Sequence, residues 1–597
     1  MFSISSLIFS DFEFKKIDVE VALTRGLPYF EIIGLPGKIV KESSFRIKEA
    51  ILKTMKDFPE KKIIVNLSPS DIPKNSKYLD LVIAFNILIQ YKLEKMKNEL
   101  KFPFSYFFEK IGDMIKNCLF IGELGLDGTI KADENILSYL INSYKYNFNY
   151  IFTSSKVYKI IKYYNKNDTF IRANVIYLDD LNSLNFIISK LIKSLNENNL
   201  NTNFYLFIKK IFNENDLFNT KKYLNNKNDN NKNIDNDYKN ENTNEDLENE
   251  RLSFSQDIDN NRVDNNNLEE KHEMATFDDY IGNDHIKYGL LIGICGFHNI
   301  FLRGATGTGK TMLSRIVMNY LPELTYSESM ELVELYSKFD VLNKGITEIR
   351  RPIRMPHHSI TETSMLGGGN YLNLGEVSLA HRGLLILDEI NLYKKTVIES
   401  LREPVNDNYV SISRVKSKIR LPSTFLLLII SNLCPCGALG DDEKICICSK
   451  SEILNFNRKI SNAIIDRIDI FLNVPKVDLN YLNNERKYED DFFSDSNIRK
   501  IIKKVQSRSI ERYESELDYF NGKINFKLFF EKLNLNKSLE DYIKLSSKKL
   551  GLSFRQYEKI LRLSRTIADI EDSEKIEKEH VETAIFYIKN LNFTIQK

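Results

Sequence analysis

Hydrophobic positions divide the chain into two ordered parts separated by a polar stretch. Over residues 1–210, short apolar runs typical of strands, such as 17–23 and 62–67, alternate with amphipathic runs typical of helices, such as 38–55. Turns that contain glycine separate these runs. The pattern predicts an N-terminal α+β domain over residues 1–210.

The polar stretch covers residues 213–273. It is rich in Asn, Asp, Glu and Lys and contains few apolar residues. Such a segment cannot bury enough surface to offset the conformational entropy that it would lose on ordering. The sequence therefore predicts a disordered linker here, long enough to let the flanking domains move relative to each other.

The segment NIFLRGATGTGKTML, residues 299–313, predicts a strand, a loop and a helix in succession. The spacing of Gly304, Gly309, Lys310 and Thr311 is that of a phosphate-binding loop, GxxxxGK[ST]. Its glycines let several backbone N–H groups point at one phosphate, the lysine reaches the outer phosphates, and the threonine hydroxyl can ligate Mg²⁺. The predicted nucleotide-binding residues are Gly304, Ala305, Thr306, Gly307, Thr308, Gly309, Lys310, Thr311 and Met312.

The run GLLILDEIN, residues 383–391, is a continuous apolar strand pattern that ends in Asp388 and Glu389. A fully buried parallel strand delivers its C-terminal residues to the crevice where ligands bind in doubly wound sheets. We therefore expect Asp388 to hold Mg²⁺ together with Thr311, and Glu389 to polarise the water that attacks the nucleotide.

Four of the six cysteines lie close together in the sequence. Cys434, Cys436, Cys446 and Cys448 have the spacing C-x-C-x9-C-x-C. Two close pairs joined by a loop can converge on a structural Zn²⁺, which prefers four thiolates in a tetrahedron. Reduced thiols without metal are the alternative, and a catalytic zinc is disfavoured because four thiolates leave no open coordination position.

The segment YVSISRVKSKIRLPS, residues 409–423, alternates in polarity and predicts a β-hairpin with one basic face. Arg414, Lys416 and Lys418 are the candidate contacts to the phosphates of DNA, because several copies of such a face in a ring would line a channel. A solvated hairpin without a ligand is the alternative. From residue 495 to 597 apolar residues recur at helical spacing, which predicts a helical domain.

Composition adds little to this picture. The formal net charge of +2 gives no global signature of nucleic-acid binding, so any such contact depends on a local basic patch. The longest apolar run, residues 425–430, is far shorter than a membrane-spanning helix. Clustered cysteines without a disulfide framework favour a reducing compartment, which predicts the cytoplasm.

Several motifs together resemble one family. GLPYFEIIGLPGKIVKES, VNLSPSDIPK and GELGLDGTIK in the N-terminal part, and RPIRMPHHSITETSMLGGGNYLNLGEVSLAHRG at 351–383, are similar to the ComM/YifB proteins, a branch of the magnesium-chelatase-like AAA+ ATPases. The resemblance covers nearly the whole chain except the linker. It implies an α/β P-loop AAA+ core with a parallel sheet at 274–480, an α+β N-terminal domain similar to the Lon protease domain, and a C-terminal α-helical lid at 495–597.

The Lon-like resemblance raises protease activity as a rival function. A Lon-type protease needs a serine nucleophile and a lysine base. By analogy the serine would lie near residues 78–80, which read Tyr-Leu-Asp, and Ser68 and Ser70 fall in the wrong part of the pattern. The required lysine is absent as well, so we expect a non-proteolytic scaffold or partner-binding domain.

The resemblance also assigns roles to three further residues. Asn432 matches the residue that senses the γ-phosphate, Arg467 the arginine inserted into the neighbouring subunit's site, and Arg555 the sensor arginine of the lid. Asn462 and Ala463 replace the Gly-Pro that the family typically has before this arginine. An Asp466–Arg467 ion pair at a helix end and a surface-helix Arg555 are the structural alternatives.

Histidines 357, 358 and 381 in the 351–383 segment invite a metal site, but no cysteine or carboxylate accompanies them at ligand spacing. We therefore expect these rings to make hydrogen bonds within loops.

Taken together, the residues and the resemblance predict an ATP-hydrolysing AAA+ motor with ATP and Mg²⁺ as ligands. Expected partners are copies of itself in a homo-hexamer, single-stranded or branched DNA, and an unknown protein bound by the N-terminal domain, with no membrane. The resemblance implies branch migration or helicase activity in recombination or natural transformation. The alternative is a metal-chelatase-like or protein-remodelling ATPase whose N-terminal domain recruits a protein partner.

Overall fold

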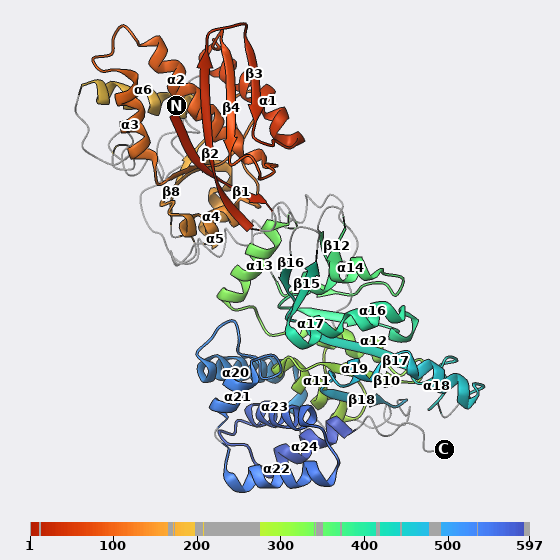
Figure 1. Cartoon of the computed structure of the whole chain (residues 1–597). Helices are drawn as coiled ribbons and strands as arrows, with labels where there is room; N and C mark the ends of the chain where they lie inside the picture. Colours follow the sequence, from red (N-terminus) through yellow and green to blue (C-terminus); the bar gives the residue numbers. More distant parts are fainter. Residues whose placement is uncertain are drawn as a thin grey trace, which may run out of the picture. The chain divides into compact units, whose positions relative to one another are not determined.

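The computed structural model describes residues 2–10, 13–164, 171, 173–197, 207, 275–339, 341, 350–369, 373–413, 418–441, 444–476, 491–533 and 535–589. The predicted linker at 213–273 lies outside the described residues. Figure 1 labels the helices and strands.

The N-terminal region is built on a mixed sheet in the order β1-β2-β4-β3, in which β3 pairs with β4 in parallel and the other neighbours are antiparallel. A second, parallel sheet has the order β5-β8-β9. The strands are β1 (Phe2–Ser10), β2 (Glu13–Thr24), β3 (Tyr29–Ile33), β4 (Lys62–Ser68), β5 (Cys118–Phe120), β6 (Glu123–Leu124), β7 (Ile130–Lys131), β8 (Tyr150–Ser154) and β9 (Asn174–Leu178). The helices are α1 (Lys38–Met55), α2 (Asp80–Lys95), α3 (Phe104–Ile115), α4 (Ile136–Ser143), α5 (Tyr158–Tyr164) and α6 (Leu181–Asn196). The α+β class expected from the sequence is confirmed.

The core is a five-stranded sheet in the order β11-β14-β17-β10-β18, and every neighbouring pair is parallel. Its strands are β10 (Ile300–Gly304), β11 (Ile353–Arg354), β14 (Leu384–Leu387), β17 (Leu426–Asn432) and β18 (Ile470–Val474). Two short pairs stand outside this sheet, β12 (Gly367–Gly368) with β13 (Asn373–Leu374), and β15 (Tyr409–Ser413) with β16 (Lys418–Pro422).

Helices and apolar clusters cover both faces of the core sheet. Along β14, Leu384 and Ile386 belong to one buried cluster and Leu385 and Leu387 to another. This alternation explains the uninterrupted apolar run in the sequence, since side chains on both faces are buried. The core helices are α11 (Asp284–Gly296), α12 (Lys310–Asn319), α13 (Tyr326–Lys338), α14 (Glu362–Leu366), α15 (Glu376–Leu379), α16 (Lys395–Ser400), α17 (Arg402–Asp407), α18 (Lys450–Arg458) and α19 (Asn462–Ile465).

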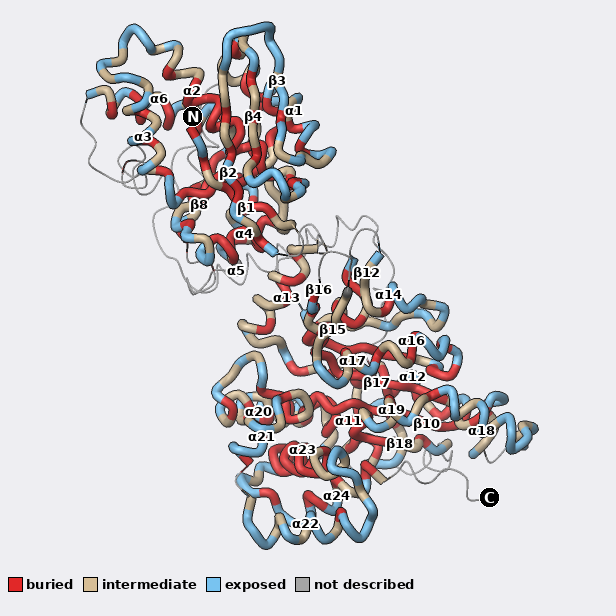
Figure 2. Tube along the Cα trace, in the orientation of Figure 1, coloured by how far each residue is buried: buried red, intermediate tan, exposed pale blue. Residues whose placement is uncertain are grey.

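The C-terminal region is helical, as predicted. Its helices are α20 (Asp495–Tyr513), α21 (Phe526–Lys532), α22 (Lys537–Lys549), α23 (Phe554–Ile570) and α24 (Lys578–Lys589). Every residue of α23 from Lys559 to Ile570 is buried (Figure 2). Its buried Asp569 accepts hydrogen bonds from Arg512 and Arg565, which offsets the cost of burying these charges. Within the described part of the chain, no helix is both long and apolar enough to span a membrane.

Candidate nucleotide site

The phosphate loop joins β10 to α12, as the sequence predicts. Gly304 is the last residue of β10, and a Cβ at this position would lie 2.4 Å from the carbonyl oxygen of Val474. Gly307 and Gly309 have φ angles of +80° and +87°, a region that side chains disfavour. Close packing therefore requires glycine at position 304, and the curved backbone requires glycine at positions 307 and 309.

Lys310 is the first residue of α12 and is buried, with its ammonium turned back onto the loop. Its Nζ donates hydrogen bonds to the carbonyl oxygens of Gly304, at 3.0 Å, and Ala305, at 2.6 Å. Burial lowers the pKa of Lys310, while the charges of Asp388 and Glu389 oppose this shift. The lysine and the two acids therefore lie within electrostatic reach of one another, as the sequence motifs require.

Asp388 and Glu389 directly follow β14 at the carboxyl edge of the sheet. Glu389 has a φ of +48°, rare for a residue with a side chain, and its backbone N–H donates to Asp388 Oδ1 at 2.8 Å. Asp388 is half-buried and Glu389 is exposed. This sharp turn leaves the Glu389 carboxylate open to solvent, where a water-polarising group has to be.

Asn432 lies beside the phosphate loop. It is the last residue of β17 and is the register partner of Gly304 in β10. Thr311 and Met312 follow Lys310 in α12, and the Thr311 side chain is exposed at the helix N-terminus. The structure thus brings all the residues of the two phosphate-handling motifs, and Asn432, to one edge of the sheet.

Asn391 is a residue of this site that sequence reasoning did not single out. Its side chain accepts a hydrogen bond from Ser431, donates to the carbonyl oxygen of Phe456 at 2.8 Å, and its backbone carbonyl accepts from Lys459. The turn after β14 is therefore fastened to β17 and to α18. The only sequence signal was the Asn at the end of GLLILDEIN.

Tyr280 is a second residue of this site that sequence reasoning did not single out. Its ring is buried and lies 3.7 Å from the place where a Cβ on Gly309 would be. Burial raises the pKa of Tyr280 to about 12. Its hydroxyl has no hydrogen-bond partner among the residues that the structure describes. The edge of the ring therefore lies beside the phosphate loop, and the hydroxyl lies beside Gly282.

Arg467 and Arg555 lie near each other. Burial lowers the pKa of Arg467, and the positive charges of Arg555 and Arg402 lower it further. Arg555 is exposed at the start of α23 and donates to Asn406 Oδ1 at 3.2 Å. Arg402, on α17, is a third member of this group that the sequence did not indicate. Among the described ion pairs none joins Asp466 to Arg467, although the charge of Asp466 acts to raise the pKa of this arginine.

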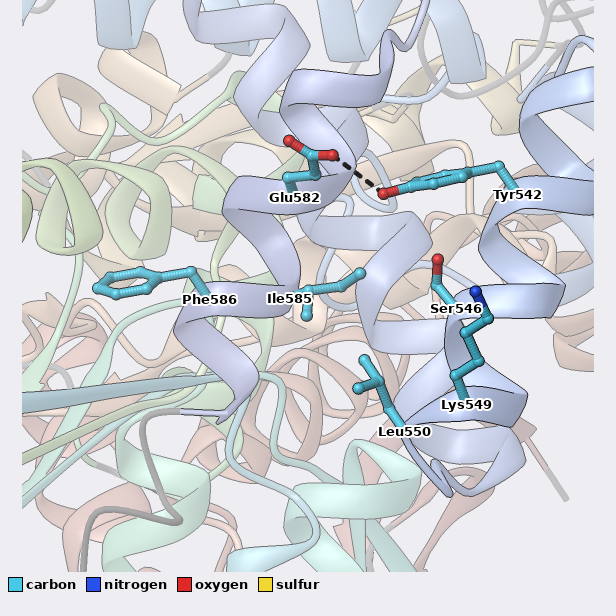
Figure 3. A pocket seen from close by; sticks show the side chains of 7 residues that line it. All are labelled: Tyr542, Ser546, Lys549, Leu550, Glu582, Ile585 and Phe586. Atoms are coloured by element: carbon cyan, nitrogen blue, oxygen red, sulfur yellow. Dashed lines mark hydrogen bonds between the residues drawn. The ribbon is translucent and has the colours of Figure 1, made fainter.

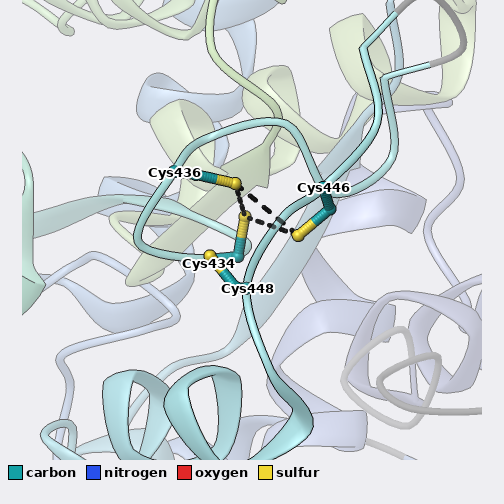
Figure 4. Close-up of side chains that lie close together, drawn as sticks. All are labelled: Cys434, Cys436, Cys446 and Cys448. Carbon is teal, nitrogen blue, oxygen red and sulfur yellow. Dashed lines mark hydrogen bonds between the residues drawn. The ribbon is translucent and has the colours of Figure 1, made fainter.

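The four clustered cysteines converge as predicted (Figure 4). The Sγ atoms of Cys434 and Cys436 are 3.4 Å apart, and Cys446 Sγ is 3.6 Å from each of them. All four sulfurs lie within 4.8 Å of one another. Zn–S bonds of ~2.3 Å in a tetrahedron place sulfurs about 3.8 Å apart, whereas a disulfide needs about 2.05 Å. The spacing fits zinc.

Local hydrogen bonds also favour thiolate ligands. The N–H of Leu439 donates to Cys434 Sγ at 3.3 Å. The backbone N–H groups of Ala438 and Ile447 lower the pKa of Cys436 to about 6, whereas burial raises the pKa values of Cys434 and Cys448. These donors stabilise the negative sulfur that a metal ion requires.

His357 and His381 make hydrogen bonds in loops, as expected. His381 is buried and its Nδ1 accepts from the N–H of Thr424 at 3.0 Å. His357 Nδ1 lies 2.8 Å from Ser359 Oγ, and its ring packs against that of His358. Within the described ranges, the cysteine cluster alone has three or more metal-ligating groups close together.

The predicted hairpin is formed by β15 and β16. Val410, Ile419 and Leu421 are buried on one face. Arg420 is exposed on the other face, where its guanidinium lies 4.8 Å from the ring of Tyr409. Lys418 begins β16, on the same face by register, while Arg414 and Lys416 lie outside the described residues.

In the N-terminal region, an ion pair lies near residues 78–80, where the resemblance predicts the position of a Lon-type serine. Asp80 is buried and accepts from Arg46 Nε at 2.8 Å and from the N–H of Leu124 at 3.2 Å. Burial raises the pKa of Asp80, against the lowering effect of Arg46. The carboxylate is thus engaged in holding α1 to α2.

A groove of about 350 Å³ lies between α22 and α24 in the C-terminal region (Figure 3). Tyr542 donates to Glu582 across it at 3.0 Å, and Leu550, Ile585 and Phe586 form its apolar part. None of its lining residues belongs to the phosphate loop or to the acidic turn after β14. It is separate from the candidate nucleotide site.

Three family models match the chain. The model described as "Magnesium chelatase, subunit ChlI" matches residues 276–482. "Subunit ChlI of Mg-chelatase" matches residues 19–156, and "Magnesium chelatase, subunit ChlI C-terminal" matches residues 494–587. The N-terminal, core and C-terminal regions therefore each have a counterpart in the same group of proteins.

Two relatives are similar over their full length. Competence protein ComM of Haemophilus influenzae is 28% identical over 96% of this chain and 94% of its own. Uncharacterized protein YifB of Escherichia coli is 25% identical over 97% of this chain and 96% of its own. The magnesium-chelatase subunit ChlI of Synechocystis is 22% identical, over 26% of this chain and 49% of its own. The likeness to ComM and YifB thus extends beyond the part shared with that chelatase subunit.

Proposed function

Because the chain belongs to the magnesium chelatase subunit ChlI-like family, with full-length homology to ComM and YifB, we propose that it is an ATP-hydrolysing AAA+ motor acting on DNA. The AAA+ domain implies an ATPase. One observation carries the proposal. Lys310 lies within electrostatic reach of Asp388 and Glu389. All three lie at the edge of the sheet where Asn432 and Gly304 are register partners.

The residues at this edge fit ATP and Mg²⁺. The curved loop leaves a cradle in which Gly307 and Gly309 carry no side chain, and Lys310 supplies the positive charge. Thr311 and Asp388 would hold Mg²⁺, which when bound neutralises charge on the phosphates. Oxygen ligands of this kind are the ones that the ion prefers.

Each side chain then has a definite task. Lys310 would exchange its two carbonyl partners for phosphate oxygens, and Asn432 would orient the γ-phosphate and the attacking water. Glu389 would accept a proton from that water, because its exposed carboxylate lies next to the metal-binding Asp388.

The arginines complete the site from a second subunit. The strongest charged neighbours of Arg467 are Arg555 and Arg402, and none of its main charged neighbours belongs to the phosphate loop or the acidic turn. We infer that this positive face meets the phosphates of an adjoining subunit, which requires a ring, and a homo-hexamer is the assembly that we propose. Arginines placed in this way stabilise charge on the transferred phosphoryl group.

DNA is the proposed substrate for two reasons. The hairpin β15–β16 presents Arg420 on the face opposite its buried one, close in the sequence to Arg414, Lys416 and Lys418. A competence protein among the full-length relatives supports a role with incoming DNA. Branch migration of single-stranded or branched DNA is the activity that we propose. We propose a cytoplasmic location, because ATP hydrolysis and four clustered thiols suit a reducing compartment.

A protein substrate is the second candidate, favoured by a different observation. Leu27, Leu35 and Phe45 of the N-terminal region are 88%, 55% and 74% exposed. Where exposed apolar side chains form a contiguous patch, they are typical of a partner-binding surface. On this alternative, the Lon-like domain recruits a protein that the motor remodels.

Charge reversal of the hairpin separates the two. Arg414→Glu, Lys416→Glu and Lys418→Glu together should remove the stimulation of ATP hydrolysis by forked DNA, measured at two salt concentrations. Stimulation of the unaltered protein should weaken as salt rises, because DNA binding releases counterions. The matched control reverses Lys500, Lys503 and Lys527, exposed lysines of the C-terminal helices. DNA stimulation that survives in the hairpin variant, or that never occurs, would favour the protein substrate.

A further inference from the structure

The loop that carries the cysteines also touches the phosphate loop. The backbone N–H of Thr306 donates to the carbonyl oxygen of Gly437 at 2.9 Å. Gly437 has a φ of +76°, and a Cβ at this position would lie 2.0 Å from Thr306 Oγ1. Glycine is the residue that permits this approach. The contact joins the middle of the C-x-C-G turn to the middle of the nucleotide-binding loop.

Besides the cysteines, the described contacts of this loop include an ion pair between Asp441 and Lys476, at 3.2 Å. Between Asn432 and the start of α18 the described residues form no helix or strand. Ile445 and Ile447, which flank Cys446, are 90% and 86% exposed, so they do not anchor the loop by burial. A metal that joins Cys434 and Cys436 to Cys446 and Cys448 would close the loop and remove most of its conformational freedom.

Both ends of the loop are fastened to the nucleotide site. It begins at Asn432, next to Ser431, which donates to Asn391 in the acidic turn. It ends at Ser449, the N-cap of α18, whose Phe456 carbonyl accepts from the same Asn391. A change in the conformation of the loop between these ends would therefore move Gly437 and alter its hydrogen bond with Thr306.

We propose that Zn²⁺ held by the four cysteines keeps Gly437 against Thr306 and thereby sets the affinity of the phosphate loop for nucleotide. The inference rests on the proposed nucleotide site and adds a metal-dependent control to it. Without the metal, the loop loses its closure, the Thr306 N–H loses its acceptor, and the phosphate loop is no longer braced in its curved form.

The test measures zinc content and binding of a fluorescent ADP analogue to the full chain. The protein should hold about one zinc per chain. Removing zinc with a zinc-selective chelator, or substituting Cys436→Ser, should weaken ADP binding about tenfold or more, and zinc added back to the chelated protein should restore it.

Gly437→Ala keeps all four cysteines but separates the two loops. We expect it to retain zinc and to lose ADP affinity to a similar extent. Gly440→Ala is the matched control, since Gly440 has a φ of +80° in the same loop but its Cβ would face Leu433. We expect it to bind zinc and ADP as the unaltered protein does. Should Cys436→Ser fail to fold, Gly437→Ala and the chelated protein still decide the question.

Each outcome has one meaning. Less than ~0.2 zinc per chain, or equal ADP affinity of the zinc-loaded, zinc-free and Gly437→Ala proteins, would overturn the inference. If the proposed nucleotide site is wrong, the result differs: Lys310→Ala retains zinc and binds ADP as tightly as the unaltered protein does.

Discussion

Gly304 and Asn432 are register partners in the parallel strands β10 and β17. The phosphate loop and the cysteine loop therefore leave the sheet at the same level, and each begins at one member of this pair. Ligands bind outside the carboxyl ends of parallel strands because the chain opens into loops there. The pair thus locates the nucleotide site between two loops that are far apart in the sequence.

Lys310→Ala should weaken ADP binding about a hundredfold, because it removes charge-assisted hydrogen bonds from a buried position. Equilibrium binding of a fluorescent ADP analogue measures the change. Lys450→Ala, at an exposed lysine on α18, is the control and should bind ADP normally. Equal affinities of the two variants would exclude Lys310 from the phosphate site.

Two inactive variants should regain activity when mixed if the arginines act on a neighbouring subunit. Lys310→Ala and Arg467→Ala each disable one side of the interface, so a mixed ring contains some interfaces with both sides intact. Arg467→Ala mixed with Arg555→Ala should stay inactive, because both changes fall on the same side. Steady-state phosphate release gives the readout, and recovery in the second mixture would place Arg555 on the opposite side.

Tyr280→Phe should weaken ADP binding by about 1 kcal/mol if the buried hydroxyl, which has no partner in the described structure, turns to the nucleotide on binding. The free energy of unfolding without nucleotide should not fall, since this hydroxyl has no partner in the described structure. Tyr320→Phe is the contrasting control, because the Tyr320 hydroxyl bonds Asp495. It should lower stability and leave ADP affinity alone. The reverse pattern would rule out a nucleotide contact for Tyr280.

Acid should destabilise the fold through His298. Its buried ring hydrogen-bonds Thr566, and burial lowers its pKa to about 4 from an ordinary 6.5. Between pH ~4 and pH ~6.5 the unfolded chain therefore binds a proton at this histidine, and the folded chain does not. Stability is therefore complete above pH ~6.5 and falls as pH drops towards ~4, by up to about 3 kcal/mol.

Denaturant unfolding from pH 7 to pH 5 measures this effect. The free energy of unfolding should fall by about 2 kcal/mol more in the unaltered protein than in His298→Gln. Asp469, Lys523, Lys559 and Arg562 surround the ring and are the same in both proteins. Parallel pH profiles would contradict the assignment.

The sequence predicted those features that depend on local spacing. The phosphate loop, the acidic turn and the cysteine cluster are each a short motif, and the hairpin and the C-terminal helices follow from periodicity. Asn391 and Tyr280 escaped because their roles depend on distant partners, Phe456 for the one and Gly309 for the other. A single Asn or Tyr carries no spacing signal.

The contact of Gly437 with Thr306 could not be predicted for the same reason. It arises only because β10 and β17 are neighbours in the sheet, which follows from strand order and not from either motif. Likewise, Arg402 joins Arg467 and Arg555 only through packing of α17 beside the start of α23. The family resemblance predicted roles for Arg467 and Arg555, whereas Arg402 was identified only from the fold.

The most direct test of the account is steady-state ATP hydrolysis by the purified protein and by Glu389→Gln, with Mg²⁺ and with or without forked DNA. We expect hydrolysis by the unaltered protein and a loss of about 10²-fold or more in Glu389→Gln, which should still bind ATP, because a general base typically contributes this much. No hydrolysis by the unaltered protein under these conditions, or equal rates in both, would contradict the assignment of this site as a hydrolytic centre.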